Sequence, residues 1–235
     1  MQKKILIVAN WKMNPATRDE AKKLFEAFKN LDAVICPPFC YLNTKIVPSG
    51  AKFSLGGQNC LWEEKGPYTG EISPKMLKDS GAEYVIIGHS ERRIHFHESD
   101  EMINKKLKAA LKSGLTPILC IGEKQGEDAQ STVENQLKED LKEISEKDAK
   151  KIIVAYEPVW AISTFGGEIC PPEKAKNILD FIKTKFSEKI IYGGSVDSKI
   201  INDYLKVGYE GALVGGASLK AEEFIKIVKD ARTEN

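Results

Sequence analysis

The sequence predicts an α/β protein built as a single (β/α)8 barrel over residues 1–235. Short apolar runs rich in β-branched residues alternate with amphipathic segments, and about eight such units fit at roughly 30 residues each. No linker rich in proline, glycine or serine divides the chain, so one domain is expected. A doubly wound open sheet is the alternative, because the number of strands does not by itself exclude it.

The strands are expected at the short apolar runs, which cover residues 5–9, 33–36, 52–56, 84–87, 116–121, 152–156, 190–192 and 211–214. Helical segments lie between most of these runs. Strands joined in this way run parallel, because the connecting helix returns the chain to the same edge of the sheet. All strands should therefore end at one face of the barrel.

Helices are expected where apolar residues recur at helical spacing, as Val133, Leu137, Leu141 and Ile144 do. The predicted helices cover residues 16–29, 98–112, 131–144, 172–186, 199–207 and 219–231, with a brief one at 41–47. The 41–47 helix is short for a barrel crossover, so the outer shell should be thin after the second strand.

The composition argues against nucleic acid and membranes as binding partners. Lys and Arg total 35 and Asp and Glu total 34, so the net charge is +1, and no strong field is available to attract nucleic acid or an anionic membrane. The five cysteines form no C-x-x-C pair, which favours a reducing compartment such as the cytoplasm. The N-terminal apolar run is too short for a signal peptide, and no stretch is long enough to span a membrane.

Polar residues follow the predicted strands at their C-terminal ends, where barrel enzymes keep their active sites. They occur as Asn10-Trp11-Lys12, Gly88-His89-Ser90-Glu91, Glu157-Pro158, Gly193-Gly194-Ser195 and Gly215-Gly216. The two glycine pairs follow the last two strands, where a phosphate site is common in barrels, and glycine lets backbone N–H groups approach an anion. Either pair alone could be a tight turn, but together they favour phosphate binding.

Four side chains at this face could carry chemistry. Glu157 is either a base or a member of a structural ion pair, because a carboxylate after a buried strand is costly to desolvate. His89 by itself is more typical of a structural residue than of a catalyst. Lys12 is expected to have an anionic partner, either Glu91 or a bound phosphate, and Asn10 could donate a hydrogen bond to an oxyanion. The alternative for both is a solvated loop, which is the more typical interpretation of Asn10 by itself.

Metal chemistry is not expected at this face. His95 and His97 lie close together in the sequence, but no carboxylate or cysteine cluster completes a metal site with them. Both histidines are therefore interpreted as surface or packing residues. Cys120 is interpreted as a buried packing residue with no chemical role.

Taken together, these residues resemble the triosephosphate isomerase family. Eight stretches match in family order: VANWKMN (8–14), GQNC (57–60), YTGEI (68–72), IGHSERR (87–93), CIGE (120–123), AYEPVWAI (155–162), YGGSV (192–196) and LVGGASL (213–219). A single motif of this kind is weak evidence, but eight in order make chance an untenable explanation. The resemblance implies a TIM barrel enzyme of glycolysis and gluconeogenesis that needs no cofactor.

The resemblance also implies roles for particular residues. Glu157 would move a proton between two carbons of a triose phosphate, interconverting dihydroxyacetone phosphate and D-glyceraldehyde 3-phosphate through an enediolate. Neutral His89 would polarise the carbonyl, and Lys12 and Asn10 would stabilise the enediolate. Backbone N–H groups would hold the phosphate near Ser163, Ser195, Gly215 and Gly216. Loop 65–73 would form a homodimer contact, with Thr69 reaching towards the partner's site.

The chain departs from the family pattern in the lid that follows the sixth strand. The family usually has Gly-Thr-Gly there, whereas Ser163 and Phe165 replace the two glycines, and the segment is about two residues longer. The 124–130 segment also lacks the family's Leu-x-Glu-Arg pattern. A non-catalytic barrel that binds a phosphorylated metabolite is therefore an alternative, as is a different phosphate-binding barrel enzyme.

Overall fold

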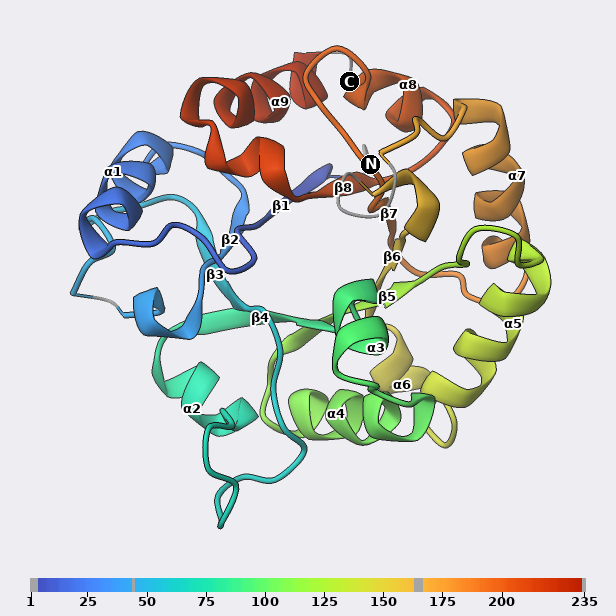
Figure 1. Ribbon diagram of the computed structural model, residues 1–235, viewed down its shortest axis with the longest axis horizontal. Helices are drawn as coiled ribbons and strands as arrows, with labels where there is room; N and C mark the ends of the chain where they lie inside the picture. The colour runs from blue at the N-terminus through green and yellow to red at the C-terminus, as the bar shows by residue number, and fades with distance from the viewer. Residues whose placement is uncertain (1–3, 44, 163–166, 234–235) are drawn as a thin grey trace.

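The computed structural model describes residues 4–43, 45–162 and 167–233, and within them eight parallel strands close into a barrel (Figure 1). The strands are β1 (Leu6–Asn10), β2 (Val34–Cys36), β3 (Ser54–Gly57), β4 (Ala82–Ile87), β5 (Thr116–Ile121), β6 (Ile153–Tyr156), β7 (Ile190–Tyr192) and β8 (Gly211–Val214). Each strand pairs with the next along the chain, and β8 pairs with β1, where Leu6 faces Gly211. The predicted (β/α)8 barrel is confirmed, and the open doubly wound sheet is wrong.

Helices form a ring around the barrel (Figure 1). They are α1 (Arg18–Phe28), α2 (Pro74–Asp79), α3 (Ser90–His95), α4 (Asp100–Lys112), α5 (Ala129–Asp140), α6 (Glu146–Ala149), α7 (Pro172–Lys183), α8 (Ile201–Lys206) and α9 (Ala221–Thr233), with short 3-10 turns η1 (Phe39–Tyr41), η2 (Val159–Ala161) and η3 (Gly216–Leu219). No helix in the described part of the chain is long and apolar enough to cross a membrane.

The buried apolar side chains form two layers, as alternation along a strand requires. One layer fills the barrel and includes Val8, Ile86, Ala155, Ile191 and Leu213. The other lies between the strands and the helices and contains the neighbours of these residues in the sequence, such as Ile7 and Val154. The parity of each strand therefore fixes which residue at its end faces the barrel mouth.

The predicted helix at 41–47 is wrong. The chain instead makes the single turn η1 and then a series of turns among the described residues of this segment. Asn43 explains part of the change, because its side-chain oxygen accepts a hydrogen bond from the backbone N–H of Lys45 at 2.8 Å, which competes with a helix. Pro48 disfavours a helical conformation at Val47.

Other helix boundaries shift for local reasons. The helix predicted at 131–144 begins at Ala129, because the Asp128 side chain caps it by accepting from the N–H of Ser131 at 2.8 Å. It ends at Asp140, and Glu143 then adopts a left-handed backbone with φ of 58°. Helices α2, α3 and α6 are too short to show a helical period, and the sequence did not predict them.

Candidate active site

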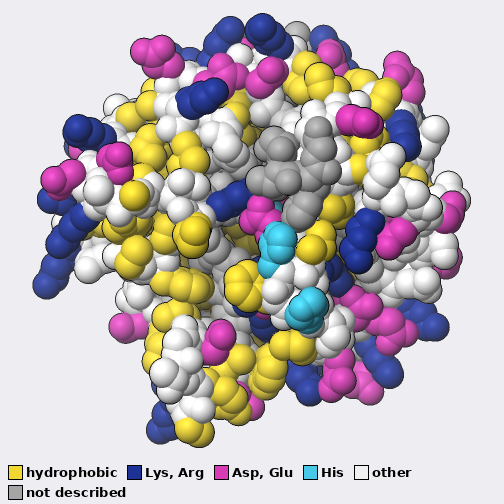
Figure 2. Space-filling view, in the orientation of Figure 1, with side chains coloured by type: hydrophobic (Ala, Val, Ile, Leu, Met, Phe, Trp, Pro, Cys, Tyr) yellow, Lys and Arg dark blue, Asp and Glu magenta, His cyan; other side chains and the backbone are white. Residues whose placement is uncertain are grey.

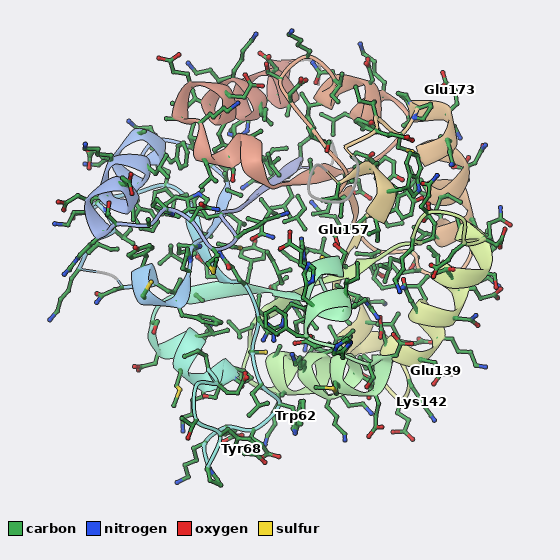
Figure 3. All side chains as sticks on the ribbon, viewed as in Figure 1. Trp62, Tyr68, Glu139, Lys142, Glu157 and Glu173 are labelled. Atoms are coloured by element: carbon green, nitrogen blue, oxygen red, sulfur yellow. The ribbon has the colours of Figure 1, made fainter. Side chains whose placement is uncertain are left out.

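Strand parity delivers functional side chains to the barrel mouth. Val8 and Ala155 lie inside the barrel. Asn10, which ends β1, and Glu157, which directly follows β6, are each two residues further along and point to the same side. The same argument places Gly193 after Ile191 and Gly215 after Leu213. In Figure 3 the Glu157 label lies near the centre of the ring of helices.

A cavity of about 180 Å³ opens among these strand ends. Its walls include seven of the eight residues for which a catalytic or substrate-binding role was predicted: Asn10, Lys12, His89, Glu157, Ser195, Gly215 and Gly216. Ile162, Val196, Leu213 and Ala217 add apolar wall. A site of this kind, apolar with a few convergent polar groups, suits a small ligand.

Glu157 is almost fully buried, with 2% of its surface exposed, and several hydrogen-bonding groups fix its position. Its backbone N–H donates to the carbonyl of Ile121 at 2.7 Å. One carboxylate oxygen, Oε2, accepts from the backbone N–H of Ser90 at 3.2 Å, and Oε1 lies 3.4 Å from His89 Nε2. The carboxylate is therefore oriented by two neighbours at the end of β4.

The hydrogen bonds of His89 identify its tautomer. Nδ1 accepts from the backbone N–H of Glu91 at 3.2 Å, as the N-cap of α3. A ring nitrogen that accepts a hydrogen bond carries no proton, so the proton of the neutral imidazole is on Nε2. Nε2 faces Glu157 and the cavity. His89 can thus donate a hydrogen bond to a ligand oxygen without bearing a charge.

Lys12 occupies a constrained position beside the cavity. Its backbone is left-handed, with φ of 52°, which is uncommon for a residue with a side chain. The Asn10 side-chain oxygen accepts from the Lys12 N–H at 3.0 Å, and the Gln58 amide donates to the Lys12 carbonyl at 2.8 Å. The Lys12 ammonium lies 2.6 Å from Glu91 Oε1, so the predicted ion pair is present.

The glycine-rich turns that follow β7 and β8 form another part of the cavity wall. A Cβ built on Gly216 would meet no atom within 4 Å, so this residue borders open space. The backbone N–H of Ser195, which was expected to face phosphate, donates instead to the carbonyl of Ala161 at 3.1 Å. Its hydroxyl is buried and has no hydrogen-bond partner among the residues that the structure describes. In this conformation the hydroxyl, rather than the N–H, is the free polar group of Ser195.

One predicted residue, Thr69, is not brought to the cavity, and another, Ser163, is not among the described residues. Thr69 is exposed on loop 65–73, and it does not line the cavity. Ser163 lies outside the described residues, as does Phe165. His95 and His97 are exposed, and within the described ranges no group of three or more histidine, cysteine or acidic residues could hold a metal ion.

Two supporting residues, Gln58 and Ser90, were not predicted to have a role. Gln58 holds the carbonyls of both Lys12 and Cys36, the latter at 2.9 Å, and Ser90 holds the Glu157 carboxylate through its backbone. Both follow a strand end, as the predicted residues do. That position was therefore the available signal, whereas the contacts themselves depend on the closed barrel.

Comparison with known proteins identifies one family. The family model described as triosephosphate isomerase matches residues 5–231. The triosephosphate isomerase of Caldanaerobacter subterraneus subsp. tengcongensis is 45% identical over 245 residues, covering 95% of this chain and 98% of the relative. That of Dictyoglomus thermophilum is 43% identical over 252 residues, covering 97% and 100%. That of Clostridium botulinum strain Loch Maree is 43% identical over 245 residues, covering 95% and 98%.

Proposed function

Because the chain belongs to the triosephosphate isomerase family, it interconverts dihydroxyacetone phosphate and D-glyceraldehyde 3-phosphate, and we propose that Glu157 is the base that moves the proton. The observation that carries this assignment is the burial of the Glu157 carboxylate in the cavity, with Oε1 3.4 Å from His89 Nε2. A base and a hydrogen-bond donor side by side suit proton abstraction next to a carbonyl.

The proposed reaction divides the work among four side chains. Glu157 takes a proton from carbon one of dihydroxyacetone phosphate, and the electron pair moves to the carbonyl oxygen. The Nε2–H of His89 donates to that oxygen, and the Lys12 ammonium and the Asn10 amide stabilise the negative charge of the enediolate. The hydroxyl proton on the oxygen of carbon one passes to the oxygen of carbon two, relayed by His89 Nε2, which gives up its proton to the second oxygen and takes one from the first. Glu157 then returns its proton to carbon two while carbon one becomes the aldehyde. Atoms and charge balance without a further reactant.

Orientation of the Asn10 amide supports its part in this scheme. Its Oδ1 accepts from the Lys12 N–H, so the amide NH2 group is left to donate elsewhere. Glu91 supports Lys12 by pairing with its ammonium. The phosphate is assigned to Ser195, Gly215 and Gly216, which line the same cavity as Glu157, and to Ser163.

The alternative of a non-catalytic binding barrel finds no support. A protein that only binds a phosphorylated metabolite has no need of a buried carboxylate beside a neutral imidazole, and burial of such a group is costly. The relatives at 43–45% identity are all named as the isomerase. The substitutions at Ser163 and Phe165, which prompted the alternative, lie outside the described residues.

A coupled assay of dihydroxyacetone phosphate isomerisation tests the proposal. We expect Glu157→Asp to lower kcat by about 100-fold or more, because shortening the side chain moves the base by about one carbon–carbon bond. Competitive inhibition by inorganic phosphate should be unchanged, because the phosphate contacts remain. The matched control is Glu173→Asp, at an exposed site on α7. Wild-type turnover in Glu157→Asp would exclude Glu157 as the base.

A homodimer through loop 65–73 is part of the proposal. The loop extends from the ring of helices at the lower edge of Figure 3, where Tyr68 is labelled. Tyr68 and Met76 are exposed, as is Met13, with 93% of its surface accessible. A partner chain that covered these side chains would remove their apolar surface from water. Sedimentation velocity at micromolar concentration should show a species of two chains, and a single-chain species at all concentrations would exclude the dimer.

We also propose a reducing compartment, the cytoplasm. All five cysteines are free, and Cys40 is exposed to solvent. An exposed thiol without a partner is poorly suited to an oxidising compartment. Fractionation of the source cells with an antibody against the chain tests this, and recovery outside the cytoplasmic fraction would overturn it.

A further inference from the structure

Three buried tyrosines pack together behind the glycine-rich wall of the cavity. Tyr192 ends β7, Tyr204 lies on α8 and Tyr209 precedes β8. The rings of Tyr192 and Tyr204 are stacked, with centroids 3.8 Å apart and planes 11° apart. Tyr209 meets Tyr192 edge-on at 5.4 Å. These contacts do not touch the cavity, and the proposed reaction gives them no role.

The stack lies directly under the turn that lines the cavity. A Cβ built on Gly194 would lie 2.2 Å from the Tyr192 hydroxyl oxygen, so the Gly194 backbone rests against that hydroxyl. Among the described residues the buried Tyr192 hydroxyl has no well-aligned hydrogen bond, but it interacts with the Tyr204 hydroxyl, so contact with Tyr204 helps to hold it in place. Backbone hydrogen bonds hold Gly193 and Ser195 at the two ends of the turn, whereas Gly194 between them rests on the Tyr192 ring, and the ring rests on what stacks against it.

Tyr204 supplies that support and is itself anchored. Its hydroxyl donates to the carbonyl of Cys170 at 2.8 Å, and Cys170 is fully buried just before α7. The bond fixes Tyr204 at one end, and the ring stack transmits that position to Tyr192. Tyr209 makes an equivalent bond, to the carbonyl of Ala175 at 2.8 Å, but it touches Tyr192 only by an edge.

We propose that Tyr204 is a positioning residue for the substrate phosphate, acting through the Tyr192 ring on the turn 193–195. The proposal rests on the proposed function, because it takes this turn as part of the phosphate site. It predicts an effect on binding of the phosphate group rather than on proton transfer, since the Tyr192 hydroxyl lies against Gly194. Gly193, the turn residue that packs against Glu157, is held separately by its N–H, which donates to the carbonyl of Tyr156 at 2.7 Å.

The test compares two buried tyrosines that differ in how they contact Tyr192: Tyr204 stacks on its face, and Tyr209 meets it by an edge. Tyr204→Phe and Tyr209→Phe each remove one buried hydroxyl that donates to a backbone carbonyl at 2.8 Å, so their costs to stability should be similar. We expect Tyr204→Phe to raise both KM and the inhibition constant of inorganic phosphate by about threefold to tenfold, the equivalent of one net hydrogen bond. Its kcat should stay within about twofold of the wild type, and Tyr209→Phe should leave all three constants unchanged.

A second variant is needed in case removal of the Tyr204 hydroxyl changes the phosphate inhibition constant only slightly. Tyr204→Leu removes the stacked ring, and the phosphate inhibition constant should rise further, again with little change in kcat. Thermal denaturation establishes that each variant is folded. Unchanged phosphate inhibition in both folded Tyr204 variants, an equal effect in Tyr209→Phe, or a loss of kcat alone would overturn the proposal. A wild-type enzyme that phosphate does not inhibit would instead contradict the proposed phosphate site.

Discussion

Gly193 is the residue whose replacement should most directly disturb Glu157, the proposed base. A Cβ built on Gly193 would lie 2.6 Å from Glu157 Cγ, and the carbonyl oxygen of Tyr156 is 3.3 Å from the same point. An ordinary contact begins at 3.4 Å, so the Glu157 side chain would have to move by about 0.8 Å. The added methyl cannot retreat, because the Tyr156 carbonyl is already close.

This displacement sets the expected size of the effect. A misplacement of about 1 Å in a reacting group can cost about 100-fold in rate, so Gly193→Ala should lower kcat by about one to two orders of magnitude. The coupled isomerase assay measures it. The Ala substitution should not strain the backbone, because the φ of Gly193 lies outside the left-handed region.

A control separates displacement of the base from general overpacking. A Cβ on Gly57 would lie 2.7 Å from Leu77 Cδ1, which is a comparable clash against α2 rather than against Glu157. Gly57→Ala should lose stability, as overpacked cores do, by about 1–3 kcal/mol, and it should keep most of its kcat. If Gly193→Ala retains wild-type kcat, or if Gly57→Ala loses as much, the steric argument is refuted.

Two further predictions concern charged groups. Lys12→Gln removes the ammonium that faces the cavity, and kcat/KM should fall by about 100-fold or more because the enediolate loses its cation; a fall of less than threefold would contradict this role. Burial raises the pKa of Asp140 to about 7, opposed by Arg93, whose Nη2 lies 2.6 Å from Asp140 Oδ2. Because this pKa exceeds the usual 3.8, the contribution of Asp140 to the free energy of unfolding is largest below about pH 4 and is lost as the pH rises to about 7. Asp140→Asn should flatten the dependence of Tm on pH between about pH 4 and pH 7. The control Asp19→Asn, at an exposed site, should leave it unchanged. Equal slopes in the two variants would contradict the assignment to Asp140.

The strands and the residues at their ends could be predicted because both depend on local pattern. Eight apolar runs gave eight strands, with boundaries that differ by at most two residues. Parallel strands end at one face, so Asn10, His89 and Glu157 had to converge once the barrel closed. The ion pair between Lys12 and Glu91 was one of two alternatives for the lysine, and the structure contains it.

The orientation of polar groups within the site could not be predicted in the same way. The tautomer of His89 depends on the backbone N–H of Glu91, and this N–H is available only because α3 begins at Ser90. Helix α3 has six residues, which is too short for a helical period to appear in the sequence. Likewise, the N–H of Ser195 is occupied by the Ala161 carbonyl, a contact between two turns that no spacing along the chain encodes.

Closure of the barrel explains why errors in the outer shell did not spread to the site. The missing helix at 41–47 lies between β2 and β3, yet these strands still pair, with Val34 opposite Ser54 and Ile35 opposite Leu55. A strand in a closed barrel has a neighbour on each side, so its position does not depend on its crossover helix alone. Asn10 and Glu157 take their direction from strand parity and from backbone bonds such as that of Glu157 to Ile121. A chain of this kind can therefore shorten its outer helices while the mouth of the barrel keeps its geometry, whereas a single added methyl at Gly193 should not be tolerated.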